Sequence, residues 1–333
     1  MTTEPFVPAY TFTVFTGTRN RAHTLPRVYD SLKAQTFRDF EWLIIDNEST
    51  DDTPNLVAAW QKEAPFPIRY IYHANRGQHG SANLAAKEAC GELFLRFDSD
   101  DSCVPEALER FKHHWDSIPP ARRHEFAGVT VLTTDERGAI HGTRFPFDPT
   151  DSDSIEIRYR HKVRGEKWGL LRTDVIREFP FPEIDGYIGL MPSSIAWNAI
   201  ARKYKTRYVN EALKIWYQDQ PTTLTNPTNY LDDVPGALIE SRSMLNHDLG
   251  WFRYAPRTFF LKAAKYSRSA LHSRISVVAQ ARQLNSFAAR ILWAAALPVG
   301  MVIWLAERRG VAHLLPGPRD RGIARAPGRR AEP

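Results

Sequence analysis

The stretch Glu92–Asp101, ELFLRFDSDD, runs from an apolar segment typical of a β-strand directly into three carboxylates within four residues. The carboxylates of Asp98, Asp100 and Asp101 repel one another. Coordination to a hard divalent cation such as Mg²⁺ or Mn²⁺ removes that cost. The alternative interpretation is a solvated turn ahead of a helix that begins near Pro105. The position directly after a strand favours a functional site.

Three upstream segments have the same strand-like composition, and stretches with apolar residues at three- and four-residue steps separate them. This alternation predicts a parallel sheet with helices on both faces, in which sites form at the carboxyl ends of the strands. The predicted strands are Tyr10–Thr16, Phe40–Ile45, Ile68–His73 and Glu92–Phe97, and the predicted helices cover 24–35, 53–62, 79–90 and 105–117. Further along, Phe126–Thr133 reads as another strand of this sheet, and Ser193–Tyr204 as a helix capped by its first serine.

A polar motif also follows each of the other three strands. Asp46–Asp52 (DNESTDD) offers a carboxylate to a nucleobase, while Ser49 or Thr50 can cap the next helix. Thr16–Arg21 (TGTRNR) contains a glycine that permits close approach to a planar base and arginines that can reach phosphates. Asn75–Asn83 (NRGQHGSAN) enters a helix whose backbone amides suit a diphosphate. Helix capping or a plain turn is the competing interpretation of the first two motifs.

Together, in this order and spacing, the four motifs make residues 10–118 resemble the nucleotide-binding half of the family-2 glycosyltransferases. The resemblance implies the GT-A fold: an α/β, Rossmann-like, mostly parallel sheet flanked by helices. The segments that carry it are GTRNR (Gly17–Arg21), IDNESTD (Ile45–Asp51), the Asn75, Gly77 and Asn83 set, and ACGEL (Ala89–Leu93) with DSDD. Two positions depart from the family pattern, because Arg19 stands where the family has tyrosine and Ala82 where a basic residue is common.

The resemblance also implies roles for individual residues. Asp46 is expected to contact the base, Asp98 the ribose or the metal, and Asp100 the metal, which is Mn²⁺ or Mg²⁺. A ring N–H faces such a carboxylate in uracil and guanine, so a UDP-sugar is the first choice of donor and a GDP-sugar the second. The full set expected to bind the nucleotide sugar is Thr16, Gly17, Arg19, Asp46, Asn75, Gly77, Asn83, Asp98 and Ser99.

A fainter resemblance to bacterial family members extends to about residue 225 and covers the acceptor side. It rests on GEKW (Gly165–Trp168) with Arg172, on 193–210, and on LKI (Leu213–Ile215). Relatives mostly invert the anomeric centre and carry a glutamate as general base after a proline that this chain places at Pro192. This chain has Ser193 after that proline. A serine cannot take the proton of the acceptor hydroxyl without its own activating base, so the general base must lie elsewhere. The prediction is Asp185, with Glu183 the second choice and Asp219 a further alternative.

The C-terminal quarter has a different character. From Asp248 to the end there are 15 Lys and Arg against 4 Asp and Glu, a local charge of +11, whereas the rest of the chain carries 29 basic and 34 acidic residues. Such a segment is drawn to anionic surfaces. Within it, Ile291–Ala306 has sixteen residues without a charge, interrupted by Pro298 and Gly300. A buried core helix, an interfacial or re-entrant anchor and a true membrane span are all open interpretations.

These observations predict a cytoplasmic enzyme, peripheral to the inner membrane, that acts on a glycan or lipid-linked acceptor. No specific nucleic acid is expected as a partner, although a steep salt dependence on DNA would reveal one. Two cysteines and a polar start favour a reducing compartment. The alternatives are a sugar nucleotidyltransferase and a catalytically inactive binding module. The predicted units are 9–118 for the nucleotide sugar, 119–225 for the acceptor, a basic helical extension at 248–310 and a disordered tail at 316–333.

Overall fold

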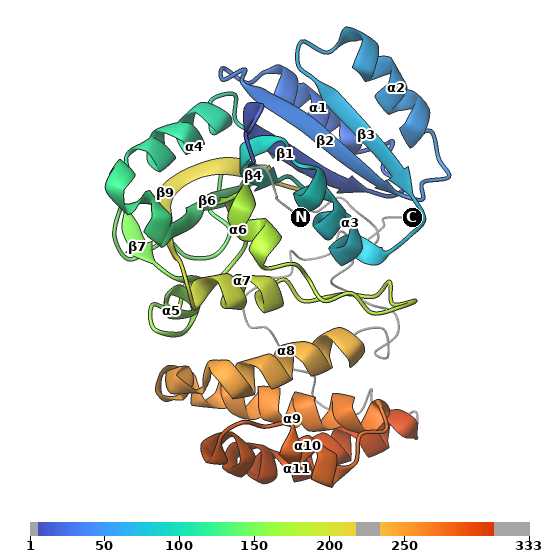
Figure 1. Ribbon diagram of the computed structural model, residues 1–333, viewed down its shortest axis with the longest axis vertical. Helices are drawn as coiled ribbons and strands as arrows, with labels where there is room; N and C mark the ends of the chain where they lie inside the picture. Colours follow the sequence, from blue (N-terminus) through green and yellow to red (C-terminus); the bar gives the residue numbers. More distant parts are fainter. Residues whose placement is uncertain (1–5, 218–233, 310–333) are drawn as a thin grey trace, which may run out of the picture.

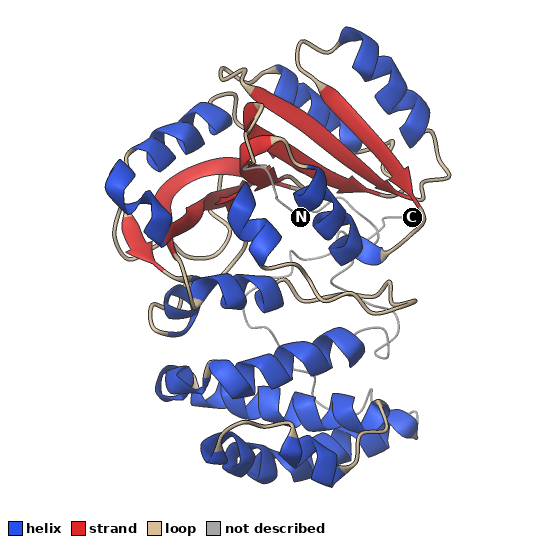
Figure 2. Cartoon of the chain, in the orientation of Figure 1, coloured by secondary structure: helices blue, strands red, loops and turns tan. Residues whose placement is uncertain are grey.

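The computed structural model describes residues 6–217 and 234–309. In Figure 1 the upper part of the molecule is a sheet with helices around it, and the lower part consists only of helices. Figure 2 shows that the strands all belong to the upper part. The predicted α/β fold with a C-terminal helical extension is therefore confirmed. Asp219 and the tail at 316–333 lie outside the described residues.

The strands of the described chain form one nine-stranded sheet in the order β3-β2-β1-β4-β8-β6-β9-β5, with β7 paired to β9. Both predicted halves of the domain therefore contribute to the same sheet. The strands are β1 (Tyr10–Thr18), β2 (Phe40–Asn47), β3 (Ile68–His73), β4 (Gly91–Arg96), β5 (Ser102–Cys103), β6 (Phe126–Asp135), β7 (Thr150–Ser152), β8 (Lys167–Arg172) and β9 (Lys205–Trp216).

Helices cover both faces of this sheet and build the lower part. The helices of the described residues are α1 (Leu25–Lys33), α2 (Thr53–Glu63), α3 (Gly77–Glu88), α4 (Ala107–Asp116), α5 (Ser154–Tyr159), α6 (Thr173–Glu178), α7 (Ser194–Ala201), α8 (Val234–His247), α9 (Pro256–His272), α10 (Val277–Arg282) and α11 (Phe287–Arg308), with short turns of 3₁₀ helix at η1 (Pro120–Glu125) and η3 (Leu249–Tyr254).

The first half of the sheet is parallel, as the sequence predicts: β1 pairs with β2 and β4, and β2 with β3. Because side chains alternate along a strand, β1 sends Phe12 and Val14 to one face and Phe15 to the other. Phe12 and Val14 belong to the main core with residues of α1, α2 and α4, whereas Phe15 packs in a second cluster with α3. Both faces are buried, which explains why these strands read as continuous apolar runs.

The second half of the sheet corrects the expectation of a mostly parallel sheet. β8 lies between β4 and β6 and is antiparallel to both, and β5 and β7 are antiparallel to β9. Only β6 and β9 pair in parallel here. The sheet is therefore mixed. Strand direction depends on the route of the connecting chain, which the local pattern of a short strand such as KWGLLR does not encode.

Of two predicted helix caps, the one at Ser49 or Thr50 is wrong, and the one at Ser193 is confirmed in position. α2 begins at Thr53 with Asp52 at the N-cap position, and Ser49 and Thr50 hydrogen-bond to Asn20 instead. The Ser49 hydroxyl accepts from the backbone of Asn20 at 2.9 Å, and the Thr50 amide donates to the Asn20 side chain at 2.7 Å. Ser193 does precede α7, but its side chain makes no capping hydrogen bond.

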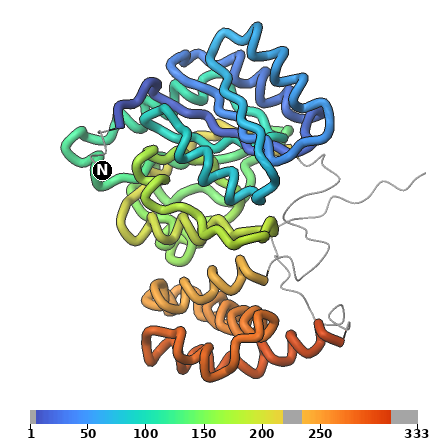
Figure 3. The backbone as a smooth tube through the Cα atoms, turned by 45° about the vertical axis from the view of Figure 1, so that its right-hand side comes forward, coloured from blue at the N-terminus to red at the C-terminus, as the bar shows by residue number. Residues whose placement is uncertain are grey.

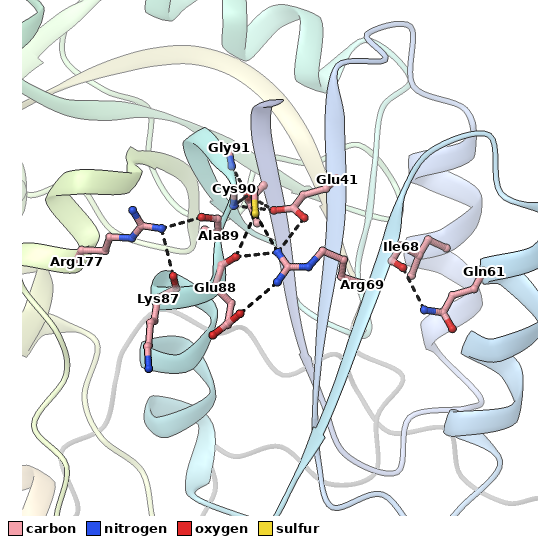
Figure 4. A network of polar contacts seen from close by, with 11 residues as sticks. Glu41, Gln61, Ile68, Arg69, Lys87, Glu88, Ala89, Cys90, Gly91 and Arg177 are labelled. Atoms are coloured by element: carbon pink, nitrogen blue, oxygen red, sulfur yellow. Dashed lines mark hydrogen bonds and ion pairs between the residues drawn. The ribbon is translucent and has the colours of Figure 1, made fainter. Parts of the chain in front are cut away.

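A polar network holds the amino ends of β2 and β4 together (Figure 4). The fully buried Glu41 accepts hydrogen bonds from Thr13 at 2.7 Å and from the Cys90 amide at 2.8 Å, and it pairs with Arg69 at 3.2 Å. Arg69 also donates to the Glu88 carbonyl at 2.7 Å. These contacts satisfy the buried carboxylate of Glu41. They lie at the amino ends of the parallel strands, whereas the polar motifs lie at the carboxyl ends. Both cysteines are free thiols, as expected.

The helical extension begins earlier than predicted, because α8 at Val234 already packs against α9. α11 packs along the other side of α9, and the shared core includes Leu245, Tyr266 and Trp293. The predicted interruption at Pro298 and Gly300 is wrong, since α11 is one continuous helix of 22 residues. Gly300 serves packing instead, because a Cβ there would lie 2.6 Å from the Ala264 carbonyl oxygen.

The helical extension is joined to the sheet domain by buried polar contacts. Asp248 accepts from Asn198 of α7 at 3.0 Å and from Arg202 at 2.8 Å. Glu240 of α8 accepts a 2.6 Å hydrogen bond from the Ser194 hydroxyl at the start of α7. Figure 3 shows the extension, in orange and red, below the sheet domain. The extension therefore holds α7 at its start and at its end.

Candidate active site

The four polar motifs meet at one edge of the sheet. β3, β2, β1 and β4 are neighbours and run parallel, so their carboxyl ends face the same way. Asn20, after β1, accepts from the Thr50 amide, and the Ala22 amide donates to Asp51 at 3.0 Å. Arg27 of α1 donates to the Asp100 carbonyl after β4 at 3.1 Å. Polar contacts therefore tie the first motif to both the second and the fourth.

The second and third motifs are joined through two asparagines. The side-chain amide nitrogen of Asn47 donates to the side-chain oxygen of Asn75 at 2.7 Å. The side-chain oxygen of Asn47 accepts from the backbone amide of Arg76 at 3.0 Å. Gly77 then opens α3 with a φ of +70°, a conformation that favours glycine. A Cβ at this position would also lie 3.0 Å from the carbonyl oxygen of Ile188. The entrance of α3 therefore approaches the 181–190 segment closely.

The acidic motif after β4 does not act as one cluster. Asp98 and Asp101 point toward Lys214 of β9, whose ammonium lies 3.1 Å from Oδ2 of Asp98 and 2.6 Å from Oδ2 of Asp101. Glu166, which precedes β8, is the third partner of the same ammonium. Lys214 is 1% exposed. The side chain of Asp100 is not among its partners, so the motif separates into a lysine-bound part and a free carboxylate.

Charge and burial shift the ionisation of this motif. Burial alone would raise the pKa of Asp98, but the positive charges of Lys214 and Arg96 outweigh it and hold that pKa well below its usual range. The three carboxylates likewise outweigh the burial of Lys214 and keep its pKa above the ordinary value. For Asp100, burial and the neighbouring Asp98 charge raise the pKa. Burial also raises the pKa of Asp101, to about 7, although Lys214 acts in the opposite direction.

Two residues expected to touch the nucleotide sugar lie beneath the surface instead. Thr16 is fully buried and accepts a 3.0 Å hydrogen bond from the Trp42 indole. Asp46 is also 0% exposed: its carboxylate accepts from the Ser49 amide at 2.7 Å and from the Tyr70 hydroxyl. Both side chains are used to hold strand ends together. The Asp46 carboxylate is therefore covered and engaged in this structure, and its contact with a base stays a prediction.

Asn83 links the donor side to the acceptor side. Its amide nitrogen donates to the Phe181 carbonyl at 2.9 Å and to Glu183 at 2.8 Å, and its oxygen accepts from the Phe181 amide at 2.8 Å. The side chain expected to bind the nucleotide sugar is therefore engaged by the 181–183 segment. A small pocket beside it is lined by Phe15, Arg96 and Trp197 among others. Asp185 lies exposed two residues beyond Glu183.

The remaining predicted residues lie along the same edge. Gly17 is near the end of β1, Arg19 is exposed just beyond it, and Ser99 is half-buried between Asp98 and Asp100. The structure adds individual contacts for residues that the sequence analysis names only as members of a motif. They are Arg96, which pairs with Asp98 at 3.2 Å, Asp101, Glu166, Lys214, and Trp168, whose indole donates to the Arg96 carbonyl at 2.6 Å. A lone lysine within the apolar strand segment LKI was the available signal for Lys214.

The comparisons with known proteins agree with this arrangement. Residues 13–169 match the family model described as glycosyl transferase family 2. An uncharacterized glycosyltransferase of Nostoc sp. is 38% identical over 91 residues, which cover 27% of this chain and 28% of that protein. The GalNAc(5)-diNAcBac-PP-undecaprenol beta-1,3-glucosyltransferase of Campylobacter jejuni is 33% identical over 97 residues, covering 28% of this chain and 31% of that protein. The chain thus spans less than a third of these curated relatives.

The fold is shared more widely than the sequence. The structure of residues 1–349 of TarS from S. aureus, in complex with UDP-GlcNAc, aligns with a TM-score of 0.59 and 17% identity over 90% of this chain and 92% of that chain. This likeness shows the fold, which is GT-A. The fold is therefore of the GT-A type, and residues 13–169 of this chain match glycosyl transferase family 2.

Proposed function

We propose that this protein transfers a sugar from a nucleoside-diphosphate sugar, with a UDP-sugar as the preferred donor, to a saccharide or lipid-linked acceptor. The observation that carries the proposal is the meeting of four polar motifs at the carboxyl ends of β3, β2, β1 and β4. The two named relatives are glycosyltransferases, one of them named for an undecaprenol-linked saccharide, and the similar TarS structure is a complex with UDP-GlcNAc. These names suggest the classes of donor and acceptor.

The donor is proposed to lie along this edge of the sheet. The exposed Arg19 and the amides at the entrance of α3 suit the charge of a diphosphate. Gly17, Asn75 and Gly77 let the backbone come close to the ligand, and Asp98 with Ser99 receives the ribose. For Asp46 to bind the base, we propose that the turn at 46–51 opens. The ring N–H of the base then donates to Asp46 in place of Ser49 or Tyr70, so the lost hydrogen bond is replaced.

The donor set at the end of β4 fits a divalent cation. Asp100 is a carboxylate two residues after Asp98, and burial together with the Asp98 charge raises its pKa. We propose that Asp98 and Asp100 hold Mn²⁺ or Mg²⁺ when the nucleotide is present. The ion would neutralise charge on the departing diphosphate. Lys214 and Arg96 keep Asp98 ionised, and each pairs with one of its two carboxylate oxygens.

The acceptor is proposed to approach from the 181–190 segment. Inversion by a single displacement needs a carboxylate to take the proton of the acceptor hydroxyl. Asp185 is exposed on this segment and is the proposed base. Glu183 is the second choice, and its hydrogen bond from Asn83 fixes it relative to α3. Asn83 holds the start of this segment through Phe181, and Gly77 lies close to Ile188 near its end.

We also propose that the helical extension rests on an anionic membrane surface from the cytoplasmic side. One helix of the described chain, α11, is long and apolar enough to cross a membrane, and only 22% of its most apolar window is buried. Trp293, Ala296 and Gly300 face α9, whereas the outer face exposes Phe287, Ile291, Val302 and Leu305. A helix packed on one side and apolar on the other fits an interfacial position better than a core or a span. The positive charge of this region matches anionic lipid headgroups.

The experiment that tests donor binding is a thermal-shift panel of UDP-, GDP- and ADP-sugars, each with and without Mn²⁺. A ligand that binds the folded state raises the unfolding temperature by mass action. A shift for UDP-sugars that requires Mn²⁺ is the expected result. Equal shifts for ADP- and UDP-sugars would count against the proposed donor.

A further inference from the structure

Lys214 is a buried lysine in the middle of a strand, and its surroundings are unusual. The chain around it, Leu213–Ile215, is apolar, yet the ammonium is met by carboxylates from two separate segments. Asp98 and Asp101 come from the turn after β4, and Glu166 from the turn before β8. A lysine ammonium has three N–H donors and no acceptor, so three carboxylate oxygens can satisfy it completely.

The same three carboxylates have the spacing of a cation site. One oxygen from each of Asp98, Asp101 and Glu166 lies within 4.8 Å of the others, and the ammonium of Lys214 occupies the space that they share. Asp101 is buried and the other two carboxylates are partly exposed, so holding the three together without a positive charge would be costly. The lysine therefore supplies the compensation that a bound metal ion supplies in an oxygen-rich site. Asp100 does not belong to this group and is not among the partners of the Lys214 ammonium in the described residues.

We propose that Lys214 is a positioning residue that acts as a built-in cation. Its ammonium holds Asp98 in place for the donor and excludes a divalent ion from the Asp98–Asp101–Glu166 cluster. The external ion is confined to Asp98 and Asp100 and binds with the nucleotide. The role of Asp98 toward the donor rests on the proposed function, whereas the exclusion of metal from the cluster does not.

The test is a titration with Mn²⁺ alone, followed by calorimetry, on the full chain without nucleotide. The wild type is expected to bind no ion under these conditions. Lys214→Met removes the charge but keeps a side chain of similar length, and it is expected to gain one Mn²⁺ per chain. Adding Asp101→Asn to Lys214→Met should abolish the gained site. Lys205→Met, on the same strand but half-exposed and paired with Glu125, is the matched control and should gain nothing.

The effect on the donor site is measured separately as affinity for UDP. Lys214→Met should weaken UDP about tenfold, because a charge-assisted contact that orders Asp98 is lost. Lys205→Met should leave the affinity unchanged. A merely structural lysine would alter stability without creating a metal site, so metal stoichiometry distinguishes the two roles.

The proposal can also be tested if Lys214→Met fails to fold on its own. If the cluster needs only a cation, millimolar Mn²⁺ should restore the folded far-ultraviolet signal and raise the unfolding temperature of this variant. A variant that stays unfolded with Mn²⁺, or folds without gaining an ion, contradicts the proposal. So does a wild type that binds Mn²⁺ without nucleotide and loses it in Glu166→Gln. None of these readouts uses a sugar, so the absence of sugar transfer would leave this proposal standing.

Discussion

The amide nitrogen of Asn83 donates a 2.8 Å hydrogen bond to Oε1 of Glu183, although the two residues are 100 positions apart in the chain. Asn83 lies on α3, beside the proposed donor site, and Glu183 lies on the segment proposed to meet the acceptor. The contact fixes the distance between the two halves of the proposed reaction. Glu183 and Asp185 are both exposed, but the hydrogen bond from Asn83 fixes the position of Glu183.

The first prediction concerns the general base. Asp185→Asn should lower kcat by roughly a hundredfold or more, since general base catalysis contributes about 10²–10⁴ to such reactions. Glu183→Gln keeps a hydrogen-bonding oxygen for Asn83 and should have a smaller effect. Steady-state kinetics of both variants, with donor KM recorded alongside kcat, provide the measurement. Normal turnover in both amides would mean that the proton leaves by another route.

The second prediction concerns the metal. Asp100→Ala should abolish transfer while leaving the unfolding temperature nearly unchanged, because Asp100 is a proposed ligand and not part of the core. Treatment of the wild type with EDTA should do the same, and added Mn²⁺ should restore activity. Glu92→Ala, an exposed carboxylate on β4, is the control and should behave as the wild type. Full activity after removal of divalent ions would contradict the metal-dependent account.

The third prediction concerns the membrane surface. Ile291→Lys with Val302→Lys places two charges on the outer face of α11 and should release the protein from vesicles that contain anionic lipid. Each buried apolar side chain of this kind contributes about 1.5–3 kcal/mol to insertion, so the loss should exceed what raised salt causes in the wild type. Co-sedimentation with anionic and neutral vesicles measures it. Phe147→Lys, exposed on the sheet domain, is the control.

Two results would contradict that third prediction. Wild-type protein that stays in the supernatant with anionic vesicles at low salt would show that this face does not bind lipid. A concentration-dependent dimer that Ile291→Lys disrupts would show instead that a second copy of the chain covers the face. Truncation after Asn246 is less informative, because α9 and α11 also cover Leu245 of α8.

Much of the fold could be predicted because its signals are local. The strand and helix alternation of residues 10–118 fixed the parallel half of the sheet and placed four motifs at one edge. The antiparallel β8 could not be predicted, since strand direction depends on distant connections. The same limit applies to the site: Asp98 pairs with Lys214, far along the chain, and Glu166 shares the same ammonium. Burial of Asp46 depends on Tyr70 in the next strand, which its own motif does not include.

The fourth prediction concerns stability and pH. Burial opposes ionisation of Glu240, but the charge of Lys262 outweighs it, so the pKa of Glu240 is lowered in the folded state. A depressed carboxylate pKa contributes stability that is present above the unfolded value of about 4.3 and is lost as pH falls through the folded value. Denaturant melts between pH 7 and pH 3 should show this loss. Glu240→Gln should be less stable at pH 7 and should reduce the pH dependence; an unchanged dependence contradicts the assignment.

The central claim is that this chain moves a sugar from a nucleotide to an acceptor. The most direct measurement incubates the full-length protein and Mn²⁺ with isotope-labelled UDP- and GDP-sugars and an extract of bacterial membrane lipids and glycans, and follows label in the product and released nucleotide. The account predicts metal-dependent incorporation from at least one UDP-sugar, absent in Asp100→Ala. The contradicting result is folded protein that binds UDP-sugars yet incorporates no label from any donor, which is the behaviour of a binding module.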